Sequence, residues 1–166
     1  MSKEPAPTGE ICRRLLLIGV AGLVLAGDQF TKWLVTDQLQ PGDSLPVLGA
    51  VMSLSYRTNT GGAFSILAGN TAVLAVISAV VLCALLLWGP GLAGTNRAAL
   101  IGVALIAGGA AGNLLDRLRL GYVVDFLDFH IWPVFNLADI GITMGAGLLV
   151  ISMLLELRRP EGPAAQ

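Results

Sequence analysis

The chain has 166 residues, of which 55% are hydrophobic and 13% charged, with a formal net charge of −1 and a mean hydropathy of +0.77. Soluble globular domains carry about a quarter charged residues, so this composition excludes a soluble globule and indicates a polytopic membrane protein of one domain. The sequence has no basic patch, which argues against nucleic acid as a partner because phosphate binding needs clustered Lys and Arg.

Four apolar segments predict the membrane-spanning helices. They cover residues 14–35, 70–89, 97–115 and 136–157, and each approaches the ~20 residues that a helix needs to cross ~30 Å of hydrocarbon. The fold class we expect is therefore an all-α membrane protein with four transmembrane helices and a small β-structured lobe on the outer, periplasmic face.

The distribution of cationic residues predicts the orientation of these helices. Six cationic residues lie on one side of the predicted membrane and four on the other, namely Lys3, Arg13, Arg14, Arg97, Arg158 and Arg159 against Lys32, Arg57, Arg117 and Arg119. This bias places both termini in the cytoplasm. Residues 1–12 and 158–166 are expected to be cytoplasmic tails, the first of them disordered.

Asp28 and Lys32 stand four residues apart near the end of the first apolar segment. That spacing lets them form an ion pair on one face of a helix. The pair can anchor the helix end, or it can shape a functional site. Cys12 and Cys83 lie far apart without a C-x-x-C pattern, so neither a disulfide framework nor a metal site is expected.

Residues 36–69 are too polar to cross a membrane, and partial alternation from residue 48 to 56 between Gly, Pro and Asn predicts short strands. These strands form the expected outer lobe. Asn59, followed by Gly61 and Gly62, can take backbone angles that bring main chain close to a ligand. An ordinary turn explains the same pattern.

The end of the third apolar segment and the outer loop over residues 116–135 hold several polar side chains. Asn113 and Arg117 share a helix face, while Asp116 can simply pair with Arg117. Asp125 has apolar neighbours on both sides, so desolvation is expected to raise its pKa. Within the same loop, Asp128 is expected to be a solvated carboxylate, and His130 an interfacial side chain instead of a base.

The fourth apolar segment opens with Asn136, a favoured N-cap, and with Asp139 in its first turn. Gly141 and Gly145 then form a face suited to close helix packing. If this face meets the third apolar helix, Asp139 is drawn towards the loop that holds Asp125.

With these spans, the polar residues from four parts of the chain converge on one membrane surface. The sequence has no H-E-x-x-H, G-x-S-x-G or Walker motif, and it has a single histidine. Paired carboxylates are therefore the remaining candidates for catalytic groups. Two aspartates held close together share a proton. One acts as a base towards water while the other donates to the carbonyl oxygen, as in aspartic proteases.

The sequence resembles the lipoprotein signal peptidases, or type II signal peptidases, of bacterial inner membranes. Five motifs carry the resemblance in order between residues 13 and 157: D-Q-F-T-K at 28–32, N-T-G-G-A-F at 59–64, G-G-A-A-G-N-L-L-D-R at 108–117, V-V-D-F at 123–126 and F-N-L-A-D at 135–139.

The resemblance implies an aspartic endopeptidase with Asp125 and Asp139 as its catalytic pair and no cofactor or metal. Residues of the same motifs are expected to bind substrate or support the site, namely Asp28, Lys32, Asn59, Gly61, Asn113, Asp116, Arg117 and Asn136. The implied substrate is a prolipoprotein, cut before the cysteine that carries diacylglycerol. The implied inhibitor is globomycin, and we expect a monomer in contact with membrane lipids, with its site near the outer leaflet of the inner membrane.

Two other classes fit parts of the pattern. A small transporter would use the acids as ion ligands, but it would hold them near the membrane midplane instead of at one face. A membrane scaffold would use its polar residues only to hold helices together. Replacing Asp139 would then destabilise the fold, whereas removal of one acid from a like-charged pair leaves stability unchanged or raised.

Overall fold

A computed structural model describes residues 7–61 and 69–158 of the chain. Residues 62–64 of the N-T-G-G-A-F motif and the predicted tail from residue 159 lie outside the described residues. In order, the elements are α1 (Pro7–Gln38), β1 (Ser44–Pro46), β2 (Ser53–Asn59), α2 (Thr71–Leu92), α3 (Arg97–Leu120), β3 (Val123–Asp128) and α4 (Leu137–Leu157).

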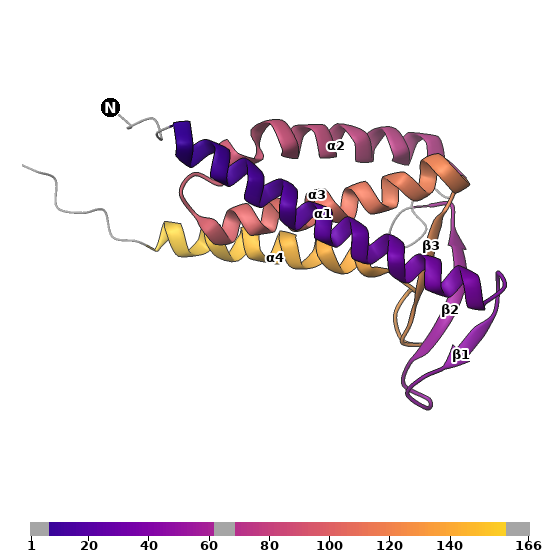
Figure 1. Cartoon of the computed structure of the whole chain (residues 1–166). Helices are drawn as coiled ribbons and strands as arrows, with labels where there is room; N and C mark the ends of the chain where they lie inside the picture. The colour runs from indigo at the N-terminus through magenta and orange to yellow at the C-terminus, as the bar shows by residue number, and fades with distance from the viewer. Residues whose placement is uncertain (1–6, 62–68, 159–166) are drawn as a thin grey trace, which may run out of the picture.

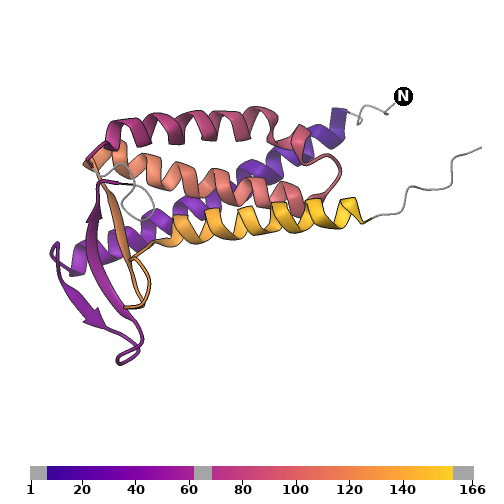
Figure 2. The same ribbon diagram turned by 180° about the vertical axis from the view of Figure 1, so that it is seen from behind.

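The helices run alongside one another, and the three-stranded sheet stands at one end of them (Figure 1). The view from behind shows α3 between α2 and α4, with the start of α1 and the end of α4 both at the end away from the sheet (Figure 2). Within their most apolar windows, α3 is 61% buried inside the protein, whereas α2 is 6% and α4 is 17% buried. The helix α3 is therefore the centre of the bundle.

The expectation of four membrane-spanning helices is confirmed in part. The described chain has four long helices, and three of them, α2, α3 and α4, are long and apolar enough to cross a membrane. The disordered tail predicted for residues 1–12 is wrong from residue 7 onward, because α1 already begins at Pro7. Its first turns are stabilised by an ion pair at 2.8 Å between Glu10 and Arg14, one helical turn apart.

The predicted β-structured lobe is present, but it draws on more of the chain than expected. The sheet is antiparallel in the order β1-β2-β3, with Arg57 opposite Asp125 and Asn59 opposite Val123. The prediction of a plain loop over residues 116–135 is wrong, because α3 continues to Leu120 and β3 follows it. The first four residues of β3 are all buried, so its sequence lacks the alternation that marks a half-exposed strand.

Glycines set the spacing between the helices. The predicted contact of the Gly145 face of α4 with α3 is confirmed, because a Cβ on Gly145 would lie 2.5 Å from the carbonyl oxygen of Gly102. Gly109 of α3 lies against the backbone of Ala138, where a Cβ would come within 2.3 Å of the carbonyl oxygen. By contrast, Gly108 faces α1, where Ala21 is its neighbour. Such small residues let membrane helices approach closely.

Substitution of Gly109 by Ala tests whether this contact positions the start of α4. The added methyl group overlaps buried backbone, so Gly109→Ala should lower the free energy of unfolding by about 1–3 kcal/mol, the cost of overpacking. The measurement is thermal unfolding of the purified protein in detergent. Gly147→Ala on α4 is the matched control, since nothing lies within 4 Å of its Cβ. Equal stability of both variants would contradict the packing account.

Candidate active site

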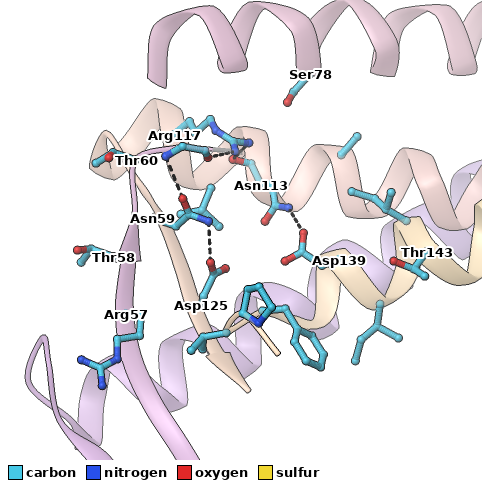
Figure 3. Close-up of a pocket in the computed structure, with 18 of the residues that line it drawn as sticks. Arg57, Thr58, Asn59, Thr60, Ser78, Asn113, Arg117, Asp125, Asp139 and Thr143 are labelled. Carbon is cyan, nitrogen blue, oxygen red and sulfur yellow. Dashed lines mark hydrogen bonds between the residues drawn. The ribbon is translucent and has the colours of Figure 1, made fainter. Parts of the chain in front are cut away.

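An open pocket of about 1230 Å³ lies between the sheet and the helices α2, α3 and α4. Asp125 and Asp139 both line it, and their carboxyl groups face the same space (Figure 3). Its lining is polar beside the sheet, with Asn59, Asn113 and Arg117, and becomes apolar farther along the helices, where Val81, Ile106, Ala110, Ile142 and Met144 contribute. The pocket therefore joins a polar end to an apolar channel between helices.

Asp125 projects from β3 and is 3% exposed. Its Oδ1 accepts a hydrogen bond from Asn136 Nδ2 at 2.7 Å, and its Oδ2 accepts one from Asn59 Nδ2 at 2.9 Å. Burial raises the pKa of this carboxyl to about 7, and the nearby charge of Asp139 acts in the same direction, whereas the two amide donors oppose it. The predicted upward shift of the Asp125 pKa is confirmed.

Asp139 is held in the first turn of α4 by a capping box. The side chain of Asn136 accepts a hydrogen bond from the backbone N–H of Asp139 at 3.0 Å, and the Asp139 carboxylate accepts one from the backbone N–H of Asn136 at 3.3 Å. Asn113 Nδ2 donates to the other carboxylate oxygen at 2.8 Å. The predicted N-cap is confirmed, and the helix N-terminus favours negative charge at this point.

Two buried amides connect the aspartates. The side-chain nitrogen of Asn136 lies 2.7 Å from the Asp125 carboxylate and 3.1 Å from Asn113 Oδ1. Asn113 in turn donates to Asp139. Hydrogen bonds between side chains thereby link the three elements β3, α3 and α4. These hydrogen bonds give each carboxyl a defined orientation in the pocket.

A buried ion cluster contacts Asn113, one of these two amides. Lys32 Nζ contacts Asp28 at 2.9 Å, Asp116 at 2.8 Å and Asn113 Oδ1 at 3.1 Å. The predicted Asp28–Lys32 pair is confirmed, but Asp116 pairs with Lys32 and not, as one interpretation held, with Arg117. Charge pairs of this kind are costly to bury and need full satisfaction of their hydrogen bonds.

The acids of this cluster also fix backbone around the site. Asp28 accepts a hydrogen bond from the N–H of Ala138 at the start of α4, and Asp116 accepts one from Val124 in β3. Gln29, which sequence reasoning did not select, donates to Asp116 at 2.9 Å and to Asp28 at 3.2 Å. Its place inside the D-Q-F-T-K motif was the available signal.

Asn59, Gly61 and Arg117 close the other side of the pocket. Asn59 Oδ1 accepts a hydrogen bond from the N–H of Gly61 at 2.9 Å, and Arg117 donates to the carbonyl of Gly61 at 3.2 Å. The Nε atom of Arg117 is buried and has no hydrogen-bond partner among the described residues. Six of the predicted residues line this space (Asn59, Gly61, Asn113, Arg117, Asp125 and Asp139), whereas Asp28, Lys32, Asp116 and Asn136 do not line it. The guanidinium of Arg117 provides positive charge next to the two acids (Figure 3).

The chain's single histidine, His130, lies elsewhere, in the turn that follows β3. Its Nε2 is 3.2 Å from Ser53 Oγ and its Nδ1 is 3.3 Å from the Asp128 carboxylate, which resembles a Ser-His-Asp arrangement. Ser53 is only 5% exposed, and neither it nor His130 lines the pocket, so no substrate could reach the hydroxyl. The backbone N–H of His130 lowers the pKa of Asp128, and these contacts hold the turn at residue 130, whose φ is +63°.

Comparison with known proteins identifies the family. The family described as "Signal peptidase (SPase) II" matches residues 20–155. The chain belongs to this family. Its members remove signal peptides from prolipoproteins, and the chain is accordingly a peptidase of the aspartic type.

Relatives and solved structures of the family extend over most of the chain. A lipoprotein signal peptidase of Moorella thermoacetica is 46% identical over 136 residues, which cover 82% of this chain and 91% of that protein. One of Halothermothrix orenii is 45% identical over 129 residues, covering 78% and 88%. A solved bacterial membrane enzyme is 30% identical with a TM-score of 0.83, covering 91% of this chain and 94% of that one. The helical fold with a small antiparallel sheet is thus shared with a solved bacterial membrane enzyme over most of the chain.

Removal of the buried cation tests the role of the ion cluster. Lys32→Met leaves two buried carboxylates without a counter-charge, so it should lower the free energy of unfolding by about 3–5 kcal/mol. The triple variant Asp28→Asn, Lys32→Met, Asp116→Asn removes every charge of the cluster and should recover most of that loss. Unfolding in detergent gives both values.

Arg14→Met is the matched control, because it breaks the i,i+4 ion pair between Arg14 and Glu10. The side chains of both residues are about half exposed. Its cost should be about 1 kcal/mol or less. A Lys32→Met variant as stable as Arg14→Met would contradict the role given to the cluster.

Proposed function

We propose that Asp125 and Asp139 are the catalytic pair of an intramembrane aspartic endopeptidase that cuts diacylglyceryl-modified prolipoproteins before the lipidated cysteine. The observation that carries the proposal is the placement of two carboxylates from different elements on one pocket, one of them with a pKa raised to about 7. A carboxyl that keeps a proton near neutral pH can act as an acid beside one that is ionised.

The surroundings of the two acids favour a division of roles between them. Asp139 lies in the first turn of α4, where the helix N-terminus favours negative charge, so it serves as the base that takes a proton from water. Asp125, in the more buried position, donates its proton to the oxygen of the scissile carbonyl. The water oxygen bonds to the carbonyl carbon and a tetrahedral diol results. As the C–N bond breaks, Asp139 gives the proton taken from water to the leaving nitrogen, and a hydroxyl of the diol returns a proton to Asp125 as the new carbonyl forms.

The pocket's two ends match the two parts of the proposed substrate. Acyl chains of the lipidated cysteine enter the apolar part between α2, α3 and α4, which is lined by Val81, Ile106 and Ile142. The peptide lies at the polar end, beside the strands that carry Asn59 and Asp125. Main-chain hydrogen bonds to such strands are a common means of peptide recognition.

The proposal includes an arrangement in the membrane. In this proposal α1 is the fourth span, packed against α3, with both termini in the cytoplasm and the sheet on the outer face of the bacterial inner membrane. Support comes from the six cationic residues against four and from the position of both helix ends opposite the sheet. The protein is a monomer among membrane lipids, and globomycin occupies the pocket of Asp125 and Asp139.

Replacement of either acid tests the proposed pair. Asp125→Asn and Asp139→Asn should each reduce cleavage of a synthetic diacylglyceryl lipopeptide by at least about a thousandfold, since each removes one half of the acid–base pair. Thermal unfolding in detergent should show that each variant keeps its fold, with a loss of about 1–2 kcal/mol or less, because the amide keeps the shape and relieves the repulsion between the acids while it loses one of two accepted hydrogen bonds. Cleavage is followed by mass spectrometry, with and without globomycin.

Asp128→Asn is the matched control, an aspartate of the same strand that does not line the pocket. It should cleave at a rate near that of the unsubstituted protein. Near-normal cleavage by either Asp125→Asn or Asp139→Asn would refute the assignment. Loss of the fold in both would instead favour the scaffold interpretation of these acids.

A further inference from the structure

Two hydroxyl groups on facing walls of the pocket take no part in the hydrogen bonds around Asp125 and Asp139. Ser78 of α2 and Thr143 of α4 both line the pocket, and the side-chain hydroxyl of neither forms a hydrogen bond to any described residue. Figure 3 shows Ser78 directed from α2 towards the other helices and Thr143 on α4 beyond Asp139. Each hydroxyl is therefore a donor that has no acceptor within residues 7–61 and 69–158.

Hydroxyls on the membrane helices usually bond to their own helix, and others in this chain do so. Thr31 donates to the carbonyl of Gly27 at 2.9 Å, and Ser152 donates to that of Leu148 at 2.7 Å. This internal bond satisfies a hydroxyl that would otherwise be costly in hydrocarbon. Ser78 and Thr143 lack that bond, so their hydroxyls remain available to a ligand.

The two residues lie farther from the sheet than the aspartates. Thr143 follows Asp139 by four residues, or about 6 Å along the helix axis. Ser78 is seven residues beyond Thr71, the first residue of α2, or about 10 Å along that helix. Around them the lining is apolar, with Val81, Ala110 and Ile142. Two lone donors in an apolar part of the pocket fit a ligand that is mainly apolar and carries a few acceptors.

We infer that Ser78 and Thr143 form a subsite for the ester carbonyls of the diacylglyceryl group. This inference rests on the function proposed above and identifies which atoms of the lipid are recognised. The glyceryl group is joined to the cysteine sulfur by a thioether, and its two ester carbonyls follow within a few bonds. Each ester offers acceptors and no donor, which complements a hydroxyl that lacks an acceptor. The acyl chains beyond them need only the apolar wall.

A pair of substrates separates this subsite from general effects on the pocket. One lipopeptide carries the diester lipid, and the other carries the dialkyl ether of the same length, which lacks both carbonyl oxygens. Ser78→Ala and Thr143→Val should each raise KM for the diester about threefold, and together about tenfold, with little change in kcat. For the ether the unsubstituted protein should already show the higher KM, and neither substitution should raise it further.

Conservative variants and a matched control show that the hydroxyl itself is responsible. Thr143→Ser keeps a hydroxyl and should keep a low KM for the diester. Ser152→Ala removes a helix hydroxyl that bonds within α4 and does not line the pocket, so it should leave both substrates unaffected. Thermal unfolding in detergent shows whether each variant retains its fold, and KM is compared only among folded variants.

Three outcomes would overturn the inference. The substitutions could leave KM for the diester unchanged, or they could raise it equally for diester and ether, which would mean that they alter the shape of the pocket. In both cases cleavage by the unsubstituted protein would leave the proposed function standing. If the unsubstituted protein cleaves neither lipopeptide, the proposed function itself fails, and the subsite fails with it.

Discussion

The placement of both aspartates depends on the hydrogen bonds of the buried Asn136 side chain. This side chain is fully shielded from solvent, it donates to Asp125 at 2.7 Å, and it caps the helix that carries Asp139. A second amide, Asn113, links it to the other carboxylate. An amide suits this place because it offers donors and an acceptor without adding charge next to two acids. The two carboxyls are thus oriented by neutral groups.

The ion cluster around Lys32 also holds in place the two elements that carry the aspartates. Asp28 holds the first turn of α4 through Ala138, and Asp116 holds β3 through Val124. Each acid therefore fixes the backbone of the element that carries one of the pocket's aspartates. Charges buried in a membrane protein are expensive, and their cost is offset here by complete pairing. The close approach of α3 to the start of α4 at Gly109 completes the framework.

Local features of the site were predictable from sequence because they depend on near neighbours. The Asp28–Lys32 pair follows from helical spacing, and the Asn136 cap follows from the start of an apolar segment. The upward shift of the Asp125 pKa follows from its apolar neighbours. The resemblance of the motifs to a known family supplied the assignment of roles, which spacing alone did not give.

Features that depend on distant parts of the chain were missed. The strand β3 is buried along its first four residues and so carries no alternation, and its pairing with β2 joins segments over sixty residues apart. The partner of Asp116 is Lys32 on another helix, whereas sequence reasoning looked for a neighbour on the same helix. Which glycine faces which helix depends on helix rotation, and so Gly108 faces α1 while Gly109 faces α4.

The most direct test of this account is a titration of the Asp125 carboxyl by ¹³C NMR in the unsubstituted protein and in Asp139→Asn. Burial and the neighbouring charge both raise the Asp125 pKa, so the carboxyl should titrate at about 7 in the unsubstituted protein. Removal of the Asp139 charge should lower that midpoint measurably. An Asp125 carboxyl that titrates near 4, or a midpoint that does not move in Asp139→Asn, would show that the two acids do not act on one another.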